Sequence, residues 1–250
     1  MLSNSKIKFL KSLHSKKFRI KHSQFIIEGH RIIKEALKAN VEFDGIWCSD
    51  EYAKKNKPFL DFVRDTQFSY EITSEKSLSQ VCDSQNNQGI IGLIDLPNDK
   101  ELNINSSNFL ILDNISDPGN MGTILRTAIW FGIKDIILSS ECVDLYNSKV
   151  VRSAMGAHFH LNQIIINSLD SVIPKLQKDG FSIIGAELDG TSINKFTVPN
   201  KWALVLGSEA HGISPSIKSL LDESVTILNK DNIESLNVAV ATGIILNSLV

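Results

Sequence analysis

Amide, carboxylate and guanidinium side chains gather after one apolar segment in the middle of the chain. Residues 109–112 are apolar, and Asn114, Asp117 and Asn120 follow them at every third position. Arg126 comes two turns into the helix expected next. Amides donate and accept hydrogen bonds. An arginine, whose pKa lies above ~12, clamps phosphate oxygens and is a poor base. The pattern predicts a polar binding site, and the alternative is an ordinary turn shaped by Asn, Asp, Pro and Gly.

Two later segments repeat this arrangement of an apolar strand followed by a polar loop. Residues 201–214 form a strand that ends in a Gly-rich loop carrying Glu209. Residues 224–243 form a strand, a loop and a helix that starts near Ser235. Open α/β sheets bind ligands at the carboxyl ends of their strands. We therefore expect the loops of residues 110–132, 201–214 and 224–243, called the first, second and third motifs, to share one edge of a sheet.

Strand and helix patterns alternate along the chain and predict an α/β protein. Before residue 97, strands are expected at residues 25–28, 44–48, 69–72 and 89–95, and helices at 31–39, 50–66 and 74–82. After residue 108, strands are expected at 109–112, 135–138, 181–186, 203–206 and 225–228, and helices at 121–131, 148–155, 171–178, 215–221 and 236–249. The polar stretch between residues 97 and 108 is typical of a linker. We predict a small α/β domain at residues 1–97, and at 108–250 a mostly parallel sheet with helices on both faces.

Composition is that of a soluble globular protein. The chain has 250 residues, 42% of them hydrophobic and 22% charged, with a net charge of −2. Residues 236–250 are the longest apolar stretch, but they are too short and too polar to span a bilayer. They are expected to form a buried helix, and no membrane association is predicted.

Cysteine and histidine usage gives no sign of a metal site. Cys48, Cys82 and Cys142 are isolated, which suits a reducing compartment and predicts a cytoplasmic protein. His158 and His160 alternate on a strand-like segment, where they could share a metal ion. No second pair of ligands accompanies them, so we interpret both as structural.

The N-terminal segment is strongly basic. Seven Lys and Arg residues lie between Lys6 and Lys21, and no acidic residue precedes Glu28. Such a segment can bind RNA phosphates, form a solvated face or act as a transit peptide. The transit interpretation is weakened because the segment runs directly into a strand and helix pattern at residues 25–37.

Taken together and in order, the three motifs resemble those of the SpoU (TrmH) family of RNA 2′-O-ribose methyltransferases in the SPOUT superfamily. The N-terminal part resembles the ribosomal-protein-like, RNA-binding domain found in the ribosomal RNA branch. The resemblance implies a trefoil-knotted C-terminal sheet, S-adenosylmethionine as cofactor, a homodimer, and methylation of a ribose 2′-hydroxyl in ribosomal RNA. A transfer RNA 2′-O-methyltransferase and a non-catalytic RNA-binding protein that retained the fold are the alternatives.

The resemblance also assigns roles to single residues. The catalytic set is Arg126, Asn120, Glu209, Ser235 and Asn237. The cofactor-lining set is Leu206, Gly207, Ile227 and Leu236. Independently of the resemblance, the basic segment supplies Lys16, Lys17, Arg19 and Lys21, which together with Arg152 form the predicted RNA-binding set.

Some positions depart from the family pattern. Ala210 replaces a glycine that usually follows the second-motif glutamate. Leu228 and Asn229 stand where Pro-Met is common, and Asp231 stands where a glycine is common. These changes affect the loop expected on the adenine side of the cofactor. The catalytic set is intact, which favours an active enzyme. The chain has no dinucleotide-binding G-x-G-x-x-G after an early strand and no hydrolase G-x-S-x-G.

Overall fold

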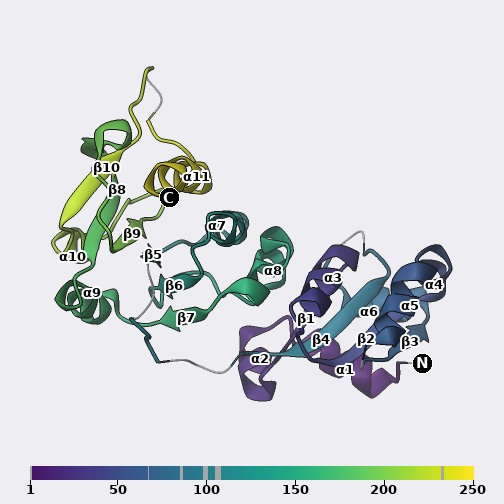
Figure 1. Ribbon diagram of the computed structural model, residues 1–250. Helices are drawn as coiled ribbons and strands as arrows, with labels where there is room; N and C mark the ends of the chain where they lie inside the picture. The colour runs from purple at the N-terminus through teal and green to yellow at the C-terminus, as the bar shows by residue number, and fades with distance from the viewer. Residues whose placement is uncertain (1, 67, 85–86, 98–100, 105–107, 232–233) are drawn as a thin grey trace. The chain divides into compact units, whose positions relative to one another are not determined.

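The computed structural model describes residues 2–66, 68–84, 87–97, 101–104, 108–231 and 234–250. Its contacts divide the chain into two compact units (Figure 1). The first unit comprises residues 1–98 with 144–159, and the second comprises residues 99–143 with 160–250. The sequence analysis placed residues 144–159 in the C-terminal domain, whereas here they pack with the first unit. Residues 98–100 and 105–107 of the predicted linker lie outside the described residues.

A four-stranded mixed sheet, in the order β1-β4-β2-β3, forms the centre of the first unit. Its strands are β1 (Gln24–Glu28), β2 (Phe43–Ser49), β3 (Tyr70–Thr73) and β4 (Ile90–Asp95). Its helices are α1 (Asn4–Ser12), α2 (Lys16–His22), α3 (His30–Lys38), α4 (Asp50–Lys55), α5 (Lys57–Asp65), α6 (Glu75–Val81) and the inserted α8 (Ser148–Ala154). Val151 of α8 belongs to the same hydrophobic cluster as Phe25 and Ile94. The inserted helix is therefore part of the core of this unit.

The second unit contains a six-stranded sheet in the order β10-β8-β9-β5-β6-β7, and every pair in it is parallel. Its strands are β5 (Asn108–Leu112), β6 (Asp135–Leu138), β7 (Gln163–Ile166), β8 (Ser182–Ser192), β9 (Trp202–Leu206) and β10 (Glu223–Thr226). Its helices are α7 (Pro118–Trp130), α9 (Leu169–Lys178), α10 (Pro215–Lys218) and α11 (Val238–Leu249). Figure 1 shows α7 and α11 on one side of the sheet and α9 on the other. The predicted fold class is confirmed.

The strand order brings two of the three motifs together. β5 pairs with β9 in parallel, and Leu112 lies opposite Leu206 at the last position of both strands. After β5 the chain adds β6 and then β7 on one side of this strand. It then adds β8, β9 and β10 on the other side, where β9 lies next to β5. This reversal makes the boundary between β5 and β9 a topological switch point, where open α/β sheets bind ligands. The trefoil knot stays a prediction from the resemblance.

Several elements differ from the expectation. Helices α1 and α2 occupy the basic segment, whose buried Ile7, Leu10 and Leu13 follow helical spacing. The helix expected at residues 50–66 is divided at Asn56, because Pro58 at the start of α5 cannot continue the preceding hydrogen-bond pattern. Strand β7 was not expected. Among the described residues, no helix is long and apolar enough to cross a membrane.

The segment with His158 and His160 was wrongly interpreted as strand-like. It forms a short 3-10 helix at Ala157–His160, in which alternate residues do not share a face. The His158 Nε2 atom lies 2.9 Å from the carbonyl oxygen of Leu145 and so donates to it. Within the described ranges, no group of three or more His, Cys, Asp or Glu residues is placed to hold a metal ion.

A candidate active site at the carboxyl ends of β5 and β9

The turn after β5 is held by a buried carboxylate. Asp113 is 2% exposed, and its Oδ2 accepts a hydrogen bond of 2.7 Å from the amide of Ser214 in the second-motif loop. Asn114 follows with φ of 58°, a left-handed conformation that Asn tolerates. The Asn114 amide donates to Ser139 Oγ at 3.0 Å. The sequence analysis did not single out Asp113, yet this residue fixes the first-motif loop to the second.

Asp117 is the N-cap of helix α7, so its role is structural, as the alternative of an ordinary turn predicted. Its Oδ1 accepts from the Asn120 amide at 2.7 Å, which is an N-cap, and Pro118 occupies the first helical turn. The cap uses only the backbone of Asn120. The side-chain amide of Asn120 is therefore left to contact groups from other loops.

Three predicted catalytic residues, one from each motif, are joined by hydrogen bonds. The Asn120 Nδ2 donates to Glu209 Oε1, and the Asn237 Nδ2 donates to Asn120 Oδ1 at 2.8 Å. We call Asn120, Glu209 and Asn237 the amide–carboxylate cluster. Asn120 is separated from Glu209 by 89 positions in the chain and from Asn237 by 117 positions, and yet the three side chains meet here. The expectation that the three loops share one edge is met for these residues.

The cluster does not include the other two members of the catalytic set. Ser235 is exposed and does not cap the last helix, because α11 begins at Val238, and Asn237 Oδ1 accepts from the amides of Ala239 and Val240. Arg126 is exposed on α7, and in the part of the chain that the structure describes its guanidinium makes no ion pair or hydrogen bond. All its donors therefore remain available to a ligand.

The second-motif loop is a tight cradle of backbone. Ser208 and Gly212 exchange two hydrogen bonds, of 3.1 and 2.9 Å, which closes the loop on itself. A Cβ atom on Gly207 would lie 2.1 Å from the carbonyl carbon of Gly212 and 2.2 Å from the amide of Ile213. Only glycine fits at this position. Glycine at position 207 therefore allows the loop to close against its own backbone.

The remaining cofactor-lining residues are apolar and partly open. Leu206 is buried at the end of β9, Ile227 is half-buried just after β10, and Leu236 is 47% exposed. The departures from the family pattern lie on the surface: Ala210 and Leu228 are exposed, and Asn229 Oδ1 accepts from the Asp231 amide at 2.9 Å. This hydrogen bond closes the altered loop locally. These residues fit an adenosine-type ligand, because they combine apolar walls with accessible backbone.

A cavity of about 470 Å³ lies between the first-motif and second-motif loops. Its wall is formed by Asn114, Ser116, Ser208, Glu209, Ala210, His211, Gly212, Ser214 and Pro215. This volume is within the range of small-molecule sites. The cavity adjoins the amide–carboxylate cluster through Glu209. His211 was missed by the sequence analysis, and its place in a loop after a buried strand was the signal that pointed to it.

The five predicted RNA-binding residues have different surroundings in the first unit. Lys16, Lys17 and Lys21 are exposed on α2. Arg19 is 3% exposed, donates to the carbonyls of Leu13 and His14 at 2.7 and 2.8 Å, and forms an ion pair with Asp144. Its guanidinium is used inside the unit and is not presented to a ligand.

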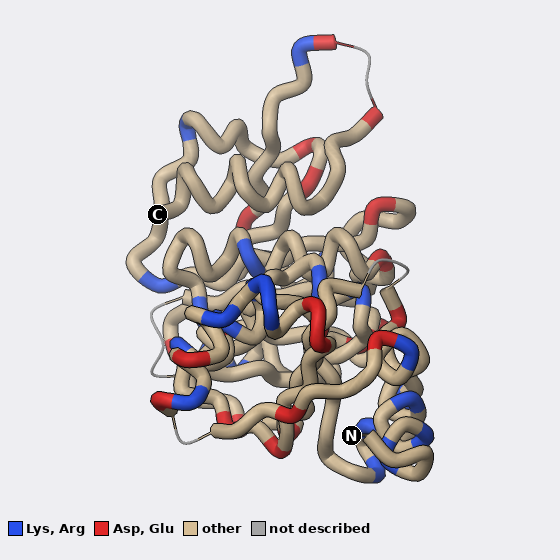
Figure 2. The backbone as a smooth tube through the Cα atoms, turned by 90° about the vertical axis from the view of Figure 1, so that its right-hand side faces the viewer, with Lys and Arg blue, Asp and Glu red and all other residues tan. Residues whose placement is uncertain are grey.

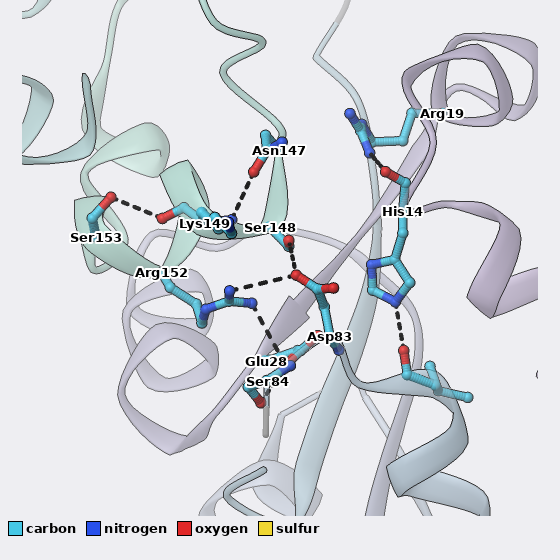
Figure 3. A network of polar contacts seen from close by, with 11 residues as sticks. His14, Arg19, Glu28, Asp83, Ser84, Asn147, Ser148, Lys149, Arg152 and Ser153 are labelled. Atoms are coloured by element: carbon cyan, nitrogen blue, oxygen red, sulfur yellow. Dashed lines mark hydrogen bonds and ion pairs between the residues drawn. The ribbon is translucent and has the colours of Figure 1, made fainter. Parts of the chain in front are cut away.

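Arg152 on α8 also forms ion pairs. Its guanidinium lies 3.9 Å from Glu28 Oε2 and 3.5 Å from Asp83 Oδ2 (Figure 3). Ser148 donates to the same Asp83 oxygen at 2.6 Å. This hydrogen bond, followed by the nearby positive charges, holds the pKa of Asp83 below its usual value. Arg152 therefore binds the inserted segment to the first unit.

The cysteine thiols are not activated nucleophiles. Burial raises the pKa of Cys48 to about 11 and that of Cys82 to about 12, and it also raises the pKa of Cys142. A thiol is nucleophilic only as the thiolate. Covalent catalysis by cysteine is therefore not supported at these positions.

Comparison with known proteins covers nearly the whole chain. The family model described as the SpoU rRNA methylase family matches residues 107–247, and an MRM3-like substrate binding domain matches residues 4–92. The chain is 31% identical to a 23S rRNA (guanosine(2553)-2′-O)-methyltransferase of Bacillus subtilis, over 98% of this chain and 96% of that protein.

Two solved structures have the same fold. An RNA methyltransferase of the TrmH family from Porphyromonas gingivalis is 31% identical, with a TM-score of 0.86 over 100% of this chain and 98% of that one. The SpoU methyltransferase AviRb from Streptomyces viridochromogenes, solved in complex with AdoMet, is 21% identical and has a TM-score of 0.86 over 99% and 97% of the two chains.

Proposed function

The chain belongs to the SpoU rRNA methylase family, and from this premise we propose that it transfers a methyl group from S-adenosylmethionine to a ribose 2′-hydroxyl of ribosomal RNA. The amide–carboxylate cluster carries the proposal, because it unites one polar residue from each motif beside a cavity. The ribosomal substrate is supported by the B. subtilis relative and by the substrate-binding family that matches the N-terminal part.

The second and third motifs would hold the methyl donor. Gly207 lets the second-motif loop close into the cradle whose backbone would face the adenosine part, and Leu206, Ile227 and Leu236 would provide apolar contact. When bound, S-adenosylmethionine supplies an electrophilic methyl carbon. The chain must align the ribose 2′-oxygen with that carbon, and such alignment alone contributes roughly 7–11 kcal/mol to lowering the barrier.

Arg126 would act on the RNA. Its free donors suit a bidentate contact with the phosphate next to the target ribose. A positive charge at this place lowers the pKa of the 2′-hydroxyl and eases loss of its proton. Asn120, oriented by Glu209 and Asn237, can accept from or donate to the ribose. Ser235, exposed beside the third motif, is the remaining candidate for contact with the substrate.

We propose a homodimer built on α7 and α11. These helices pack on each other yet leave large apolar side chains in solvent: Trp130 is 83%, Val240 52%, Ile244 39% and Val250 70% exposed. A second copy of the chain would cover them and would place Arg126 beside a facing site. Light scattering at micromolar concentration should give twice the mass of one chain, and the mass of one chain would contradict the dimer.

The division of labour follows the predicted domains. We propose that residues 1–97 bind RNA and that residues 108–250 carry the methyltransferase site, with residues 144–159 serving the packing of the first part. We propose that the protein acts in the cytoplasm, on the ribosomal RNA of that compartment. RNA contact is assigned to Lys16, Lys17 and Lys21, since Arg19 and Arg152 are engaged in ion pairs.

One experiment tests the reaction. Purified protein is incubated with methyl-labelled S-adenosylmethionine and with ribosomal or transfer RNA, and the RNA is then cleaved in alkali. A 2′-O-methylated nucleotide resists cleavage, because its internal nucleophile is blocked. Resistance in ribosomal RNA is expected. Resistance in transfer RNA alone would redirect the substrate, a methylated base would overturn the ribose assignment, and RNA binding without any transfer would indicate a non-catalytic protein.

A further inference from the structure

Helix α2 is anchored by one side chain and presents the others to solvent. Arg19 points inward and holds the carbonyls of Leu13 and His14. With 100° between successive residues of a helix, Lys17 and Lys21 lie on the side opposite Arg19. Phe18 and His22 lie together on one flank, and Lys16 and Ile20 on the other. All seven of these α2 residues except Arg19 are exposed.

Rings form a continuous strip that begins on α2. Phe18 and His22 are parallel, with centroids 6.4 Å apart and an interplanar angle of 8°. His22 meets the Phe9 ring of α1 edge-on at 5.1 Å, and Lys6 Nζ lies 5.1 Å from the Phe9 centroid. We call Phe9, Phe18 and His22 the aromatic strip. Phe18 is 36% exposed, so part of its ring is open to solvent.

The charged residues of the N-terminal segment that carries the strip are all basic. Lys17 and Lys21 lie next to the flank with Phe18 and His22, and no Asp or Glu occurs in the sequence before Glu28. Figure 2 shows Lys and Arg positions in blue along the chain near the N-terminus. A cationic row beside exposed ring faces is complementary to a phosphate backbone whose bases are free to stack. A protein partner would instead need its own acidic side chains to pair with these lysines and an apolar surface to cover the rings.

We propose that the aromatic strip and Lys17 and Lys21 form a platform for unpaired nucleotides of the RNA substrate. This inference rests on the proposed function and adds that the contacted RNA is single-stranded. In an A-form duplex the base faces are covered by their neighbours, so rings can stack only on loops, bulges or ends. The platform contributes stacking from Phe18 and His22, and charge from the two lysines.

Fluorescence anisotropy of the full chain with labelled oligouridylate tests the platform, and a labelled RNA duplex serves as the second probe. Phe18→Ala should weaken oligouridylate binding by about five- to hundredfold, the range for losing one stacked base. Duplex binding should hardly change. Lys17→Ala should weaken both probes and lower the salt slope by about one, whereas Phe18→Ala should leave the slope unchanged.

Phe62→Ala is the matched control. Phe62 is a 44% exposed phenylalanine on α5 of the same unit, but its neighbours Asp61 and Asp65 are acidic. The Phe62→Ala variant should bind both RNA probes with the affinity of the unaltered protein. The proposal is overturned if Phe18→Ala binds oligouridylate normally, or if Phe18→Ala and Phe62→Ala lose affinity equally. Neither binding assay requires methyl transfer, so the two proposals can fail separately. If the protein binds RNA through the platform but transfers no methyl group, only the proposed reaction is contradicted. If it transfers methyl groups but Phe18→Ala binds RNA normally, only this inference is contradicted.

Discussion

Arg19 in the first unit and Arg126 in the second have opposite surroundings. The Arg19 guanidinium is buried, bound to two carbonyls and paired with Asp144, whereas Arg126 is exposed and has no ion pair among the described residues. A buried charge that lost its partner would be costly, so Arg19 is committed to the fold. An exposed guanidinium has little effect on stability and can contact a phosphate. Residue type alone therefore does not separate a structural arginine from a functional one, but its surroundings do.

The largest effect is expected from breaking the Arg19 pair. Arg19→Met should lower the free energy of unfolding by about 3–5 kcal/mol, because Asp144 is left nearly buried without a counter-charge. Urea unfolding measures the change. Arg19→Met combined with Asp144→Leu should recover much of the loss, since neither charge then remains. If Arg19→Met alone is as stable as the unaltered protein, Arg19 is not needed for the fold, and the proposed difference between Arg19 and Arg126 is wrong.

Arg126→Ala should show the opposite profile. Methyl transfer should fall on the order of 100- to 1,000-fold, the usual cost of removing one group that stabilises the transition state. Unfolding should change by less than about 0.5 kcal/mol, as for an exposed surface residue. Cofactor affinity measured by calorimetry should stay unchanged. Arg126→Lys retains the charge without the planar fork and should recover only part of the activity. A strongly destabilised Arg126→Ala would show that Arg126 is structural as well.

Gly207→Ala tests the backbone cradle within the second unit. The new methyl group would collide with the backbone of Gly212 and Ile213, and this overpacking should weaken cofactor binding by about five- to hundredfold. Gly243→Ala is the control, because the nearest atom to its Cβ would be Thr127 Cγ2 at 3.8 Å. Calorimetry on both variants measures the difference. Equal affinity in the two would remove Gly207 from the cofactor site.

Asn237→Ser separates the two roles of this residue. A serine can still cap α11 through its hydroxyl, but it cannot donate to Asn120 as the amide does. Stability should be retained, and the turnover rate should fall by about three- to tenfold, the range for one lost hydrogen bond. If activity and stability fall together, the cluster only supports the fold.

A further effect concerns pH and the inserted segment. Burial lowers the pKa of His158 to about 4, against 6.5 for a free histidine, because the folded unit disfavours the charged ring. The stability that neutral His158 gives is complete above pH 6.5 and is lost as the pH falls toward 4, by up to about 1 kcal/mol per pH unit. Urea unfolding of His158→Gln should lack this component. An identical pH profile in the variant would exclude His158 as its source.

The sequence predicted the second unit better than the first for a physical reason. β5, β9 and α7 show their period and their turn residues locally, so the loops with Asn120 and Glu209 could be placed at one edge. The pairing of Arg19 with Asp144 joins residues 125 positions apart, and nothing local announces it. The same holds for Arg152, whose carboxylate partners Glu28 and Asp83 are also distant in the sequence. Basic residues alone therefore predicted too many RNA contacts.

The insertion of residues 144–159 into the first unit sets an order for folding during synthesis. The chain crosses between the units after residue 98, before residue 144 and again after residue 159. While the ribosome is still making β5 and β6, the N-terminal sheet exists without α8, and Arg19 and Glu28 lack the charges that balance them. At about 5–20 residues per second, the nascent first unit waits some seconds for its last helix. Its completion is thus tied to a moment when only β5, α7 and β6 of the second unit have been made.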